Sequence, residues 1–166
     1  MADPIVVGVD TTADSLRALS TAADLAEEHT TLLIAMHVRH EPTLASVATV
    51  AGEAVAIEPT LDELEVMTRT HVADVMAGRQ VNWRFDVAFG DPGTELIKAA
   101  AEHRAGAIVV GGRNHGVVGG LVLGSVAQKL VRKSPVSVLV VRDGHTHRVN
   151  DASRSRGPVT SVGPDR

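Results

Sequence analysis

A glycine-rich segment from Gly111 to Ser125 contains the residues whose types and spacing best suit binding chemistry in this chain. Its glycines let backbone N–H groups approach an anion without obstruction by a Cβ atom. Ser125 opens a predicted helix, and the unpaired N–H groups and positive dipole of a helix start favour a phosphate. The segment predicts a phosphate cradle. A long turn whose glycines only satisfy backbone geometry is the alternative explanation.

Asp10 is the second candidate, because it directly follows an apolar run, Ile5–Val9, that is typical of a buried strand. In an open parallel sheet, ligands bind beyond the carboxyl ends of the strands, where the strand order reverses. A carboxylate at that place can accept hydrogen bonds from ribose hydroxyls or help to hold a phosphate-bound Mg²⁺. The alternative role of Asp10 is to cap a turn or a helix. Asp91, just before Pro92, is interpreted as a helix cap and not as an acid catalyst.

Eight histidines raise the question of a metal site. His37 and His40 straddle a predicted strand end without an evident third ligand, and His145 and His147 lie in a segment without periodicity. A structural zinc site needs a complete ligand set. The histidines are therefore interpreted as solvated or hydrogen-bonding side chains. A Ser-His-Asp triad is defined by geometry, so none can be identified from spacing.

These candidates are positioned by strands that alternate with helices along the chain. The expected strands are Ile5–Val9, Thr31–Val38, Val81–Phe89, Ala107–Val110 and Val136–Val141. The first expected helix is capped by Asp14 or Ser15 and ends near His29. The second begins with a capping box of Thr60 and Glu63 and reaches about Ala77. The third runs from Pro92 to about Arg104, and the fourth is capped by Ser125 and ends before Pro135. This alternation predicts an α/β fold with a single open five-stranded parallel sheet and helices on both faces.

The segments outside this pattern have their own expected roles. Apolar and polar residues alternate strictly over Val81–Phe89, which predicts an edge strand with Trp83 and Phe89 on its buried face. Residues 39–59 form an irregular excursion broken by proline and glycine. Residues 143–166 have no periodicity, so we expect a flexible C-terminal tail after a domain over residues 1–142.

Composition excludes several classes of function. The chain has no cysteine, which excludes a disulfide framework, a thiolate zinc site and a cysteine nucleophile, and suits a cytoplasmic location. A net charge of -4 provides no general field for binding nucleic acid. No apolar stretch approaches the roughly 20 residues that a helix needs to span a bilayer, so no membrane partner is expected.

Several segments together resemble the universal stress protein family. They are VVGVD followed by DSLRAL, LLIAMHV, FGDPGTELIKAA, and IVVGGRNHGVVGGLVLGSVAQKLVRKSPVSVLVVR. The resemblance covers Pro4 to about Arg142, and the last block is its specific part. It implies a Rossmann-like sheet in the order 3-2-1-4-5 and a homodimer formed through the fifth strand, here Val136–Val141. In one branch of the family it also implies ATP binding.

That branch carries a glycine, two residues, a second glycine, nine residues, and then a glycine with Ser or Thr. Gly111, Asn114 and the pair Gly124-Ser125 occupy these places, so Asn114 replaces a glycine. Asparagine enters left-handed backbone conformations more readily than most residues, which favours retention of the loop conformation. Thr11 is a second departure, because many members have a glycine after the strand-end aspartate.

The resemblance also assigns the members of a nucleotide site. Gly8, Val9 and Asp10 would border ribose and adenine, and Val38 would meet adenine through its backbone. The residues around the phosphates would be Gly111, Asn114, Gly116, Gly124, Ser125 and Val126. Arg113 and His115 are the potential cations of the loop, and they either contact phosphates or point into solvent. Asp10 would also contact a nucleotide-bound Mg²⁺.

The first hypothesis for function is a stress-response or signalling protein that binds ATP, ADP or AMP and thereby changes conformation or partner. A dedicated P-loop ATPase carries a lysine before its Ser or Thr, and this chain has Gly124 there, so hydrolysis is expected to be slow or absent and no catalytic residue is assigned. The G-x-G-x-x-G fingerprint of dinucleotide enzymes does not follow the first strand. Two alternatives stay open. One is a dimeric interaction module in which Asn114 and Thr11 keep nucleotide out, and the other is a slow ATP hydrolase.

Overall fold

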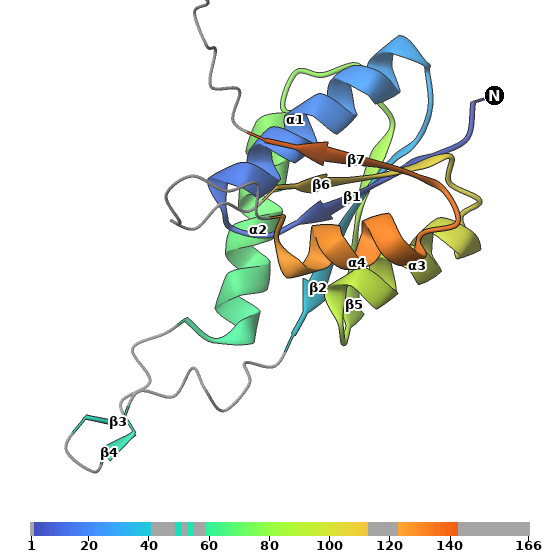
Figure 1. Ribbon diagram of the computed structural model, residues 1–166. Coiled ribbons are helices and arrows are strands. Elements are labelled where there is room, and N and C mark those ends of the chain that lie inside the picture. Colours follow the sequence, from blue (N-terminus) through green and yellow to red (C-terminus); the bar gives the residue numbers. More distant parts are fainter. Residues whose placement is uncertain (1, 41–48, 51–52, 55–58, 113–122, 143–166) are drawn as a thin grey trace, which may run out of the picture.

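The computed structural model describes residues 2–40, 49–50, 53–54, 59–112 and 123–142. Five strands form one sheet in which every neighbouring pair is parallel. They are β1 (Ile5–Val9), β2 (Leu33–Arg39), β5 (Trp83–Phe89), β6 (Ala107–Gly111) and β7 (Ser137–Val141). Their order across the sheet is β5-β2-β1-β6-β7 (Figure 1), which is 3-2-1-4-5 when these five are counted along the chain. The expected Rossmann-like order is confirmed.

Two short strands were not foreseen. β3 (Thr49–Val50) and β4 (Glu53–Ala54) form a separate antiparallel pair within the segment expected to be an irregular excursion. Strands of two residues are too short to leave a periodic pattern in the sequence. The rest of residues 41–58 and the expected tail, residues 143–166, lie outside the described part of the chain.

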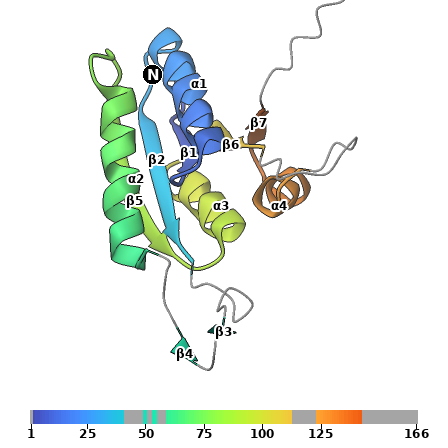
Figure 2. The same cartoon turned by 90° about the vertical axis from the view of Figure 1, so that its left-hand side faces the viewer.

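Four helices cover the sheet on both faces, as expected. They are α1 (Ala13–Glu28), α2 (Leu61–Met76), α3 (Pro92–Glu102) and α4 (Ser125–Lys133). Figure 2 shows α1 and α2 on one side of the sheet and α3 and α4 on the other, and the packing of the buried side chains agrees. No helix within the described ranges is long and apolar enough to cross a bilayer.

The two faces of β1 explain why its sequence is apolar without alternation. Val7 packs in a cluster with α1 and α2, whereas Val6 packs with α3 and α4, and both side chains are fully buried. Leu19 fills the first cluster and Ile34 the second, also without exposure. Burial of one such side chain stabilises the fold by about 1.5–3 kcal/mol. The strand that ends at the candidate site is therefore held by apolar packing on both of its faces.

The first turn of α1 differs from the prediction. Thr12, and not Asp14 or Ser15, is the N-cap, because its hydroxyl accepts a hydrogen bond from the backbone N–H of Ser15 at 3.3 Å. A carboxylate oxygen of Asp10 accepts from the backbone N–H of Thr12 at 2.8 Å and from its hydroxyl. This turn ends the strand and places the helix cap two residues before Asp14 and three before Ser15, the two predicted caps.

The caps predicted for the other three helices can be compared with the observed ones. The capping box of Thr60 and Glu63 is present at the start of α2, and Asp91 caps α3 by accepting from Thr94 N–H at 2.9 Å, so both predictions are confirmed. The prediction for α4 was wrong by one residue, because Gly124 is the N-cap and Ser125 is the first helical residue. Gly124 has no side chain with which to satisfy the first N–H groups of the helix.

β5 lies at the edge of the sheet, as expected, but its apolar face is not buried along its whole length. Phe85 and Val87 are partly buried, whereas Trp83 is 37% exposed and Phe89 is 70% exposed. An edge strand has a neighbour on one side only, and here that neighbour is β2. The guanidinium of Arg39, on β2, lies 5.2 Å from the centre of the Phe89 ring and covers part of it.

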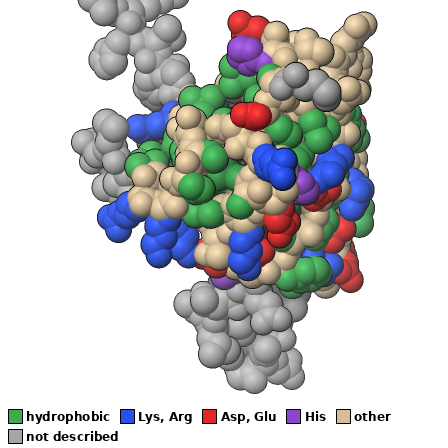
Figure 3. Space-filling model, turned by 90° about the vertical axis from the view of Figure 1, so that its right-hand side faces the viewer, with side chains coloured by type: hydrophobic (Ala, Val, Ile, Leu, Met, Phe, Trp, Pro, Cys, Tyr) green, Lys and Arg blue, Asp and Glu red, His purple; other side chains and the backbone are tan. Residues whose placement is uncertain are grey.

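The surface charges are mixed on the face turned to the right of Figure 1. Figure 3 shows Lys and Arg side chains there, interspersed with acidic and hydrophobic side chains.

Candidate functional site

A cavity of about 640 Å³ lies at the carboxyl ends of β1, β2 and β6. β1 is the strand at which the order reverses, because β2 and β5 follow it on one side and β6 and β7 on the other. Small-molecule sites typically have volumes of about 300–1,000 Å³ and form at this position in open α/β sheets. Both the place and the size of the cavity suit a small ligand.

Most of the residues expected at the site line this cavity. They are Gly8, Val9, Asp10, Val38, Gly111, Gly124, Ser125 and Val126. Thr11, the second departure from the family pattern, lines it beside Asp10. The remaining four candidates, Arg113, Asn114, His115 and Gly116, lie outside the described residues. The structure thus brings together four separate segments of the sequence: residues 8–11, Val38, Gly111 and residues 124–126.

Asp10 lies in the turn between β1 and α1. Besides the bonds to Thr12, the backbone N–H of Asp10 donates to the hydroxyl of Ser15 at 2.7 Å. Ser15 is buried, so this bond fixes the strand end against the helix. The turn-capping role weighed for Asp10 is observed, and the residue also lines the cavity.

Gly111 ends β6 where the first turn of α1 comes closest. A Cβ atom at this position would lie 2.8 Å from the backbone carbon and oxygen of Asp14, closer than real side chains approach. The glycine therefore has a packing reason to be there, independent of any ligand. The same close approach brings the turn at Asp10 and the end of β6 to one rim of the cavity.

An apolar wall of the cavity comes from residues that sequence reasoning assigned only to the core or did not single out. Leu61 and Leu64 of α2 line it together with Met36 and Leu96. Thr68 belongs to the same wall and is fully buried, with its hydroxyl donating to the carbonyl of Leu64 at 2.7 Å. Sequence periodicity identified the apolar stripe of α2 but could not show which part of it faces a cavity.

His37 lines the cavity as a structural residue. It is 7% exposed, and its Nδ1 lies 3.1 Å from the carbonyl oxygen of Val9. Its ring stacks on Phe85 with centres 6.3 Å apart and planes 18° apart. His40, the other member of the pair, has its Nδ1 3.3 Å from the carbonyl of Gly90. Within the described residues, no three His, Asp or Glu side chains are grouped in a way that could hold a metal ion.

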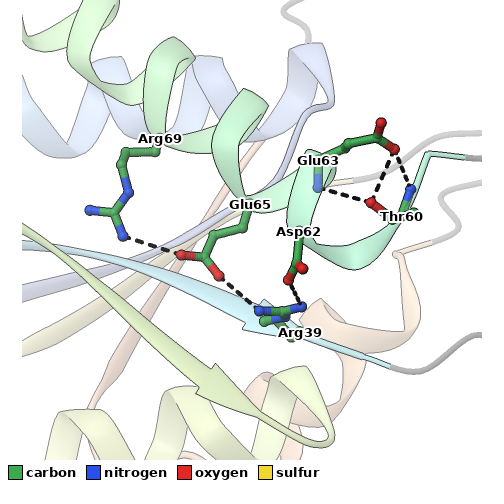
Figure 4. Close-up of polar contacts among 6 residues, drawn as sticks. All are labelled: Arg39, Thr60, Asp62, Glu63, Glu65 and Arg69. Carbon is green, nitrogen blue, oxygen red and sulfur yellow. Dashed lines mark hydrogen bonds and ion pairs between the residues drawn. The ribbon is translucent and has the colours of Figure 1, made fainter.

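Arg39 fastens the end of β2 to α2 at the mouth of the cavity (Figure 4). Its guanidinium pairs with Asp62 and, at 3.2 Å, with Glu65, and Glu65 also pairs with Arg69 at 3.3 Å. The Arg39 side chain is only 18% exposed, so these contacts are partly shielded from water. The network holds the first turns of α2, including Leu61 and Leu64, beside the cavity.

Lys129 of α4 is a cation of the cavity lining that sequence reasoning missed. Its ammonium lies 2.5 Å from Oδ1 of Asp91 and 3.1 Å from the hydroxyl of Thr94, and both Lys129 and Asp91 line the cavity. The hydrogen bond from Lys129, followed by those from Thr94, lowers the pKa of Asp91 from 3.8 to about 2. Lys129 follows Ser125 by one helical turn, and this spacing could have identified it as a neighbour of the site.

The fold and the sequence are both similar to known proteins. The family model described as the universal stress protein family matches residues 1–142. A universal stress protein of Thermus aquaticus is 34% identical over 140 residues, covering 83% of this chain and 97% of the relative. A solved universal stress protein in complex with cAMP is 24% identical, with a TM-score of 0.64 over 85% of this chain and 97% of that one. Another, from Archaeoglobus fulgidus in complex with dAMP, is 21% identical, with a TM-score of 0.58 over 83% and 96%. These two structures share the fold of this chain.

Proposed function

This chain belongs to the universal stress protein family, and from that membership we propose that it binds an adenine nucleotide in the cavity at the carboxyl ends of β1, β2 and β6. One observation carries the proposal. The turn at Asp10, the end of β6 at Gly111 and the start of α4 at Gly124 and Ser125 border a single cavity of nucleotide size. Binding is the proposed function, through which a stress-response protein would change its conformation or its partner.

The phosphate end of the proposed site is the start of α4. The first N–H groups of a helix have no partner within the helix, and the glycine at the N-cap supplies no side-chain acceptor. Ser125 and Val126 line the cavity at this place. A phosphate there would be bound by backbone donors and by the positive end of the helix dipole.

The adenosine end of the proposed site is apolar. Met36, Leu61, Leu64 and Leu96 line it, and Val38, near the end of β2, lines it as well. Adenine has a large apolar surface with a few polar edges, which suits such walls. Two proteins with the same fold have been solved in complex with cAMP and with dAMP, which supports an adenine nucleotide as the ligand.

ATP is the form that the sequence pattern favours, and Asp10 is the residue that would contact a nucleotide-bound Mg²⁺. Its carboxylate borders the cavity, and Mg²⁺ is usually held by one or two carboxylates together with substrate phosphates. We assign no catalytic residue and propose that hydrolysis is slow or absent.

Calorimetric titration of the nucleotide-stripped protein tests the proposal, with Mg-ATP, AMP, cAMP and adenosine as ligands. The matched variant is Gly124→Val, whose side chain would project into the cradle. The backbone at Gly124 has φ of −58°, which a valine adopts without strain. We expect micromolar or tighter binding of at least one adenine nucleotide, reduced more than tenfold in the variant. No heat with any of the four ligands, and no shift in melting temperature, would refute the proposal.

We also propose that the protein forms a homodimer through β7. β7 is an edge strand of the sheet, and Leu139 on it is 39% exposed, while Val131 on the adjoining α4 is 59% exposed. An apolar edge strand exposes unpaired N–H and C=O groups and requires cover. A second copy related by a two-fold axis would place the same strand and the same apolar residues opposite one another.

A further inference from the structure

We propose that Lys129 is a phosphate-binding residue of the cavity, and that Asp91 competes with the nucleotide phosphate for its ammonium group. This inference rests on the proposed nucleotide binding and names the cation that selects phosphorylated ligands. According to this proposal, the ion pair between Lys129 and Asp91 breaks when the ligand binds, and Lys129 then pairs with the phosphate. The ion pair is therefore not a fixed structural bridge.

The position of Lys129 on α4 carries the first step. It lies four residues after Ser125, which is about one turn and roughly 6 Å along the helix axis, so the two residues share a face. Both line the cavity. Side chains on a helix lean towards its N-terminus, so the stem of Lys129 is directed back towards the turn that holds Gly124 and Ser125. A phosphate bound at that turn lies within reach of a lysine ammonium.

The packing of the Lys129 stem carries the second step. A Cβ atom on the buried Gly93 would lie 2.6 Å from Cδ of Lys129 and 3.1 Å from its Cγ. The stem therefore crosses the first turn of α3 in space that only a glycine leaves open. The side chain as a whole is 32% exposed. Its stem is held while its ammonium can still move between partners.

The surroundings of Asp91 carry the third step. Its carboxylate accepts from the backbone N–H of Thr94 at 2.9 Å and from the Thr94 hydroxyl at 2.8 Å, besides the bond from Lys129. The two bonds from Thr94 cap α3 and remain when Lys129 leaves. The Asp91 side chain is 50% exposed, so water can replace the ammonium at small cost. A phosphate group has more charge and more acceptor oxygens to offer Lys129 than one carboxylate has.

The other cation among the described lining residues is less suited to the exchange. Arg39 is held by two carboxylates, Asp62 and Glu65, and its side chain is only 18% exposed. It also comes from β2, next to Val38, at the end assigned to adenosine. Lys129, in contrast, comes from the helix whose start forms the phosphate end of the site. Within the described lining, the exchangeable cation is Lys129.

The test compares affinities for ATP and for adenosine, measured calorimetrically with the full chain. Lys129→Gln should weaken ATP binding by about tenfold and leave adenosine binding unchanged, because it removes one charge-assisted hydrogen bond to phosphate. Lys129→Arg should restore most of the ATP affinity. Asp91→Asn should tighten ATP binding several-fold, since asparagine still caps α3 but competes less for Lys129. Lys98→Gln removes a 59% exposed lysine that lies outside the cavity lining, and it should change neither affinity.

The outcomes separate this inference from the proposed function. If the wild type binds neither ligand, nucleotide binding fails and the inference fails with it. If the wild type binds ATP but Lys129→Gln leaves the ratio of ATP to adenosine affinity unchanged, or lowers both affinities alike, Lys129 has a structural role only. Weaker ATP binding in Asp91→Asn would show that Asp91 assists the ligand, which overturns the competition. Circular dichroism and melting temperatures of all variants confirm that each is folded.

Discussion

Val9 and His37 are partners in the register of β1 and β2, and the imidazole of His37 turns back to bind the carbonyl oxygen of Val9 at 3.1 Å. A carbonyl oxygen can only accept, so Nδ1 of His37 carries the proton. Both residues are buried, with 5% and 7% exposure. The histidine thus satisfies a strand-end carbonyl directly before the turn at Asp10.

Replacement of His37 by leucine should therefore lower the free energy of unfolding by about 1–3 kcal/mol, because a buried carbonyl loses its donor. The measurement is urea unfolding followed by circular dichroism. His29→Gln is the control, since His29 is exposed at the end of α1 and its cap contacts are made by the backbone. Equal stability of His37→Leu and the wild type would show that Val9 finds another donor.

Asp91 should contribute to the acid sensitivity of the fold. Lys129 and Thr94 lower its pKa to about 2, below the value of an unfolded aspartate. The stability gained from the ionised group is fully present above a pH of about 4 and is lost as the pH falls towards about 2. The wild type should exceed Asp91→Asn in stability at neutral pH by no more than about 1 kcal/mol, because the pair is half exposed.

This difference between the wild type and Asp91→Asn should shrink as the pH is lowered from 5 to 2. Urea midpoints measured across that range check the expectation, and taking the difference between the two proteins cancels the titration of the other carboxylates. A difference that stays constant over the range would mean that Asp91 has an ordinary pKa in the folded protein.

Gly111 and Gly112 allow a matched comparison of backbone crowding. A Cβ at Gly111 meets the backbone of Asp14, whereas a Cβ at Gly112 meets the flexible side chain of Arg142 at 2.6 Å. Backbone cannot give way as a long side chain can. Gly111→Ala should therefore cost about 1–3 kcal/mol of stability and Gly112→Ala less, as measured by denaturant unfolding. The reverse order would contradict the close approach of α1 to β6.

The proposed dimer gives a prediction for β7, the strand at the edge of the sheet opposite to β5. Leu139→Lys places a charge on the exposed face of β7 and should convert the dimer to a monomer in sedimentation at micromolar concentration. Val66→Lys alters an apolar residue that is 64% exposed on α2, a helix that packs against α1 and β2, and it should leave the dimer intact. A wild-type protein that sediments as a monomer would remove the proposal.

The fold was largely predictable because its signals are local. The unbroken apolar run of β1 and the capping box at Thr60 each lie within a few residues, and local pattern is what sequence reasoning reads. The strand order came from resemblance to a family, because periodicity does not order strands. The cap at Thr12 was missed because it depends on the carboxylate of Asp10, which could equally have faced a ligand.

The candidate site was predictable only where residues follow strand ends or begin a helix. Asp10, Gly111 and Ser125 were found by that rule, and the structure places them at one cavity. The spacing of Lys129 from Ser125 marks it as a neighbour of the site, but its pairing with Asp91, the distant N-cap of α3, could not be read from the sequence. The exposure of Phe89 was missed because alternation identifies a face of a strand but not what covers it.

The pairing of β1 with β6 has a consequence for synthesis on the ribosome. Val7 and its partner Val109 are about a hundred residues apart in the sequence, so the chain between them must be made before the two strands can pair. Contacts so distant in sequence make folding slow and leave the half-made sheet with an exposed apolar edge. A nascent chain that ends before α4 also lacks Gly124, Ser125 and Lys129. If the proposed site binds a nucleotide, its retention would therefore report that the chain has been made as far as α4 and that these segments have come together.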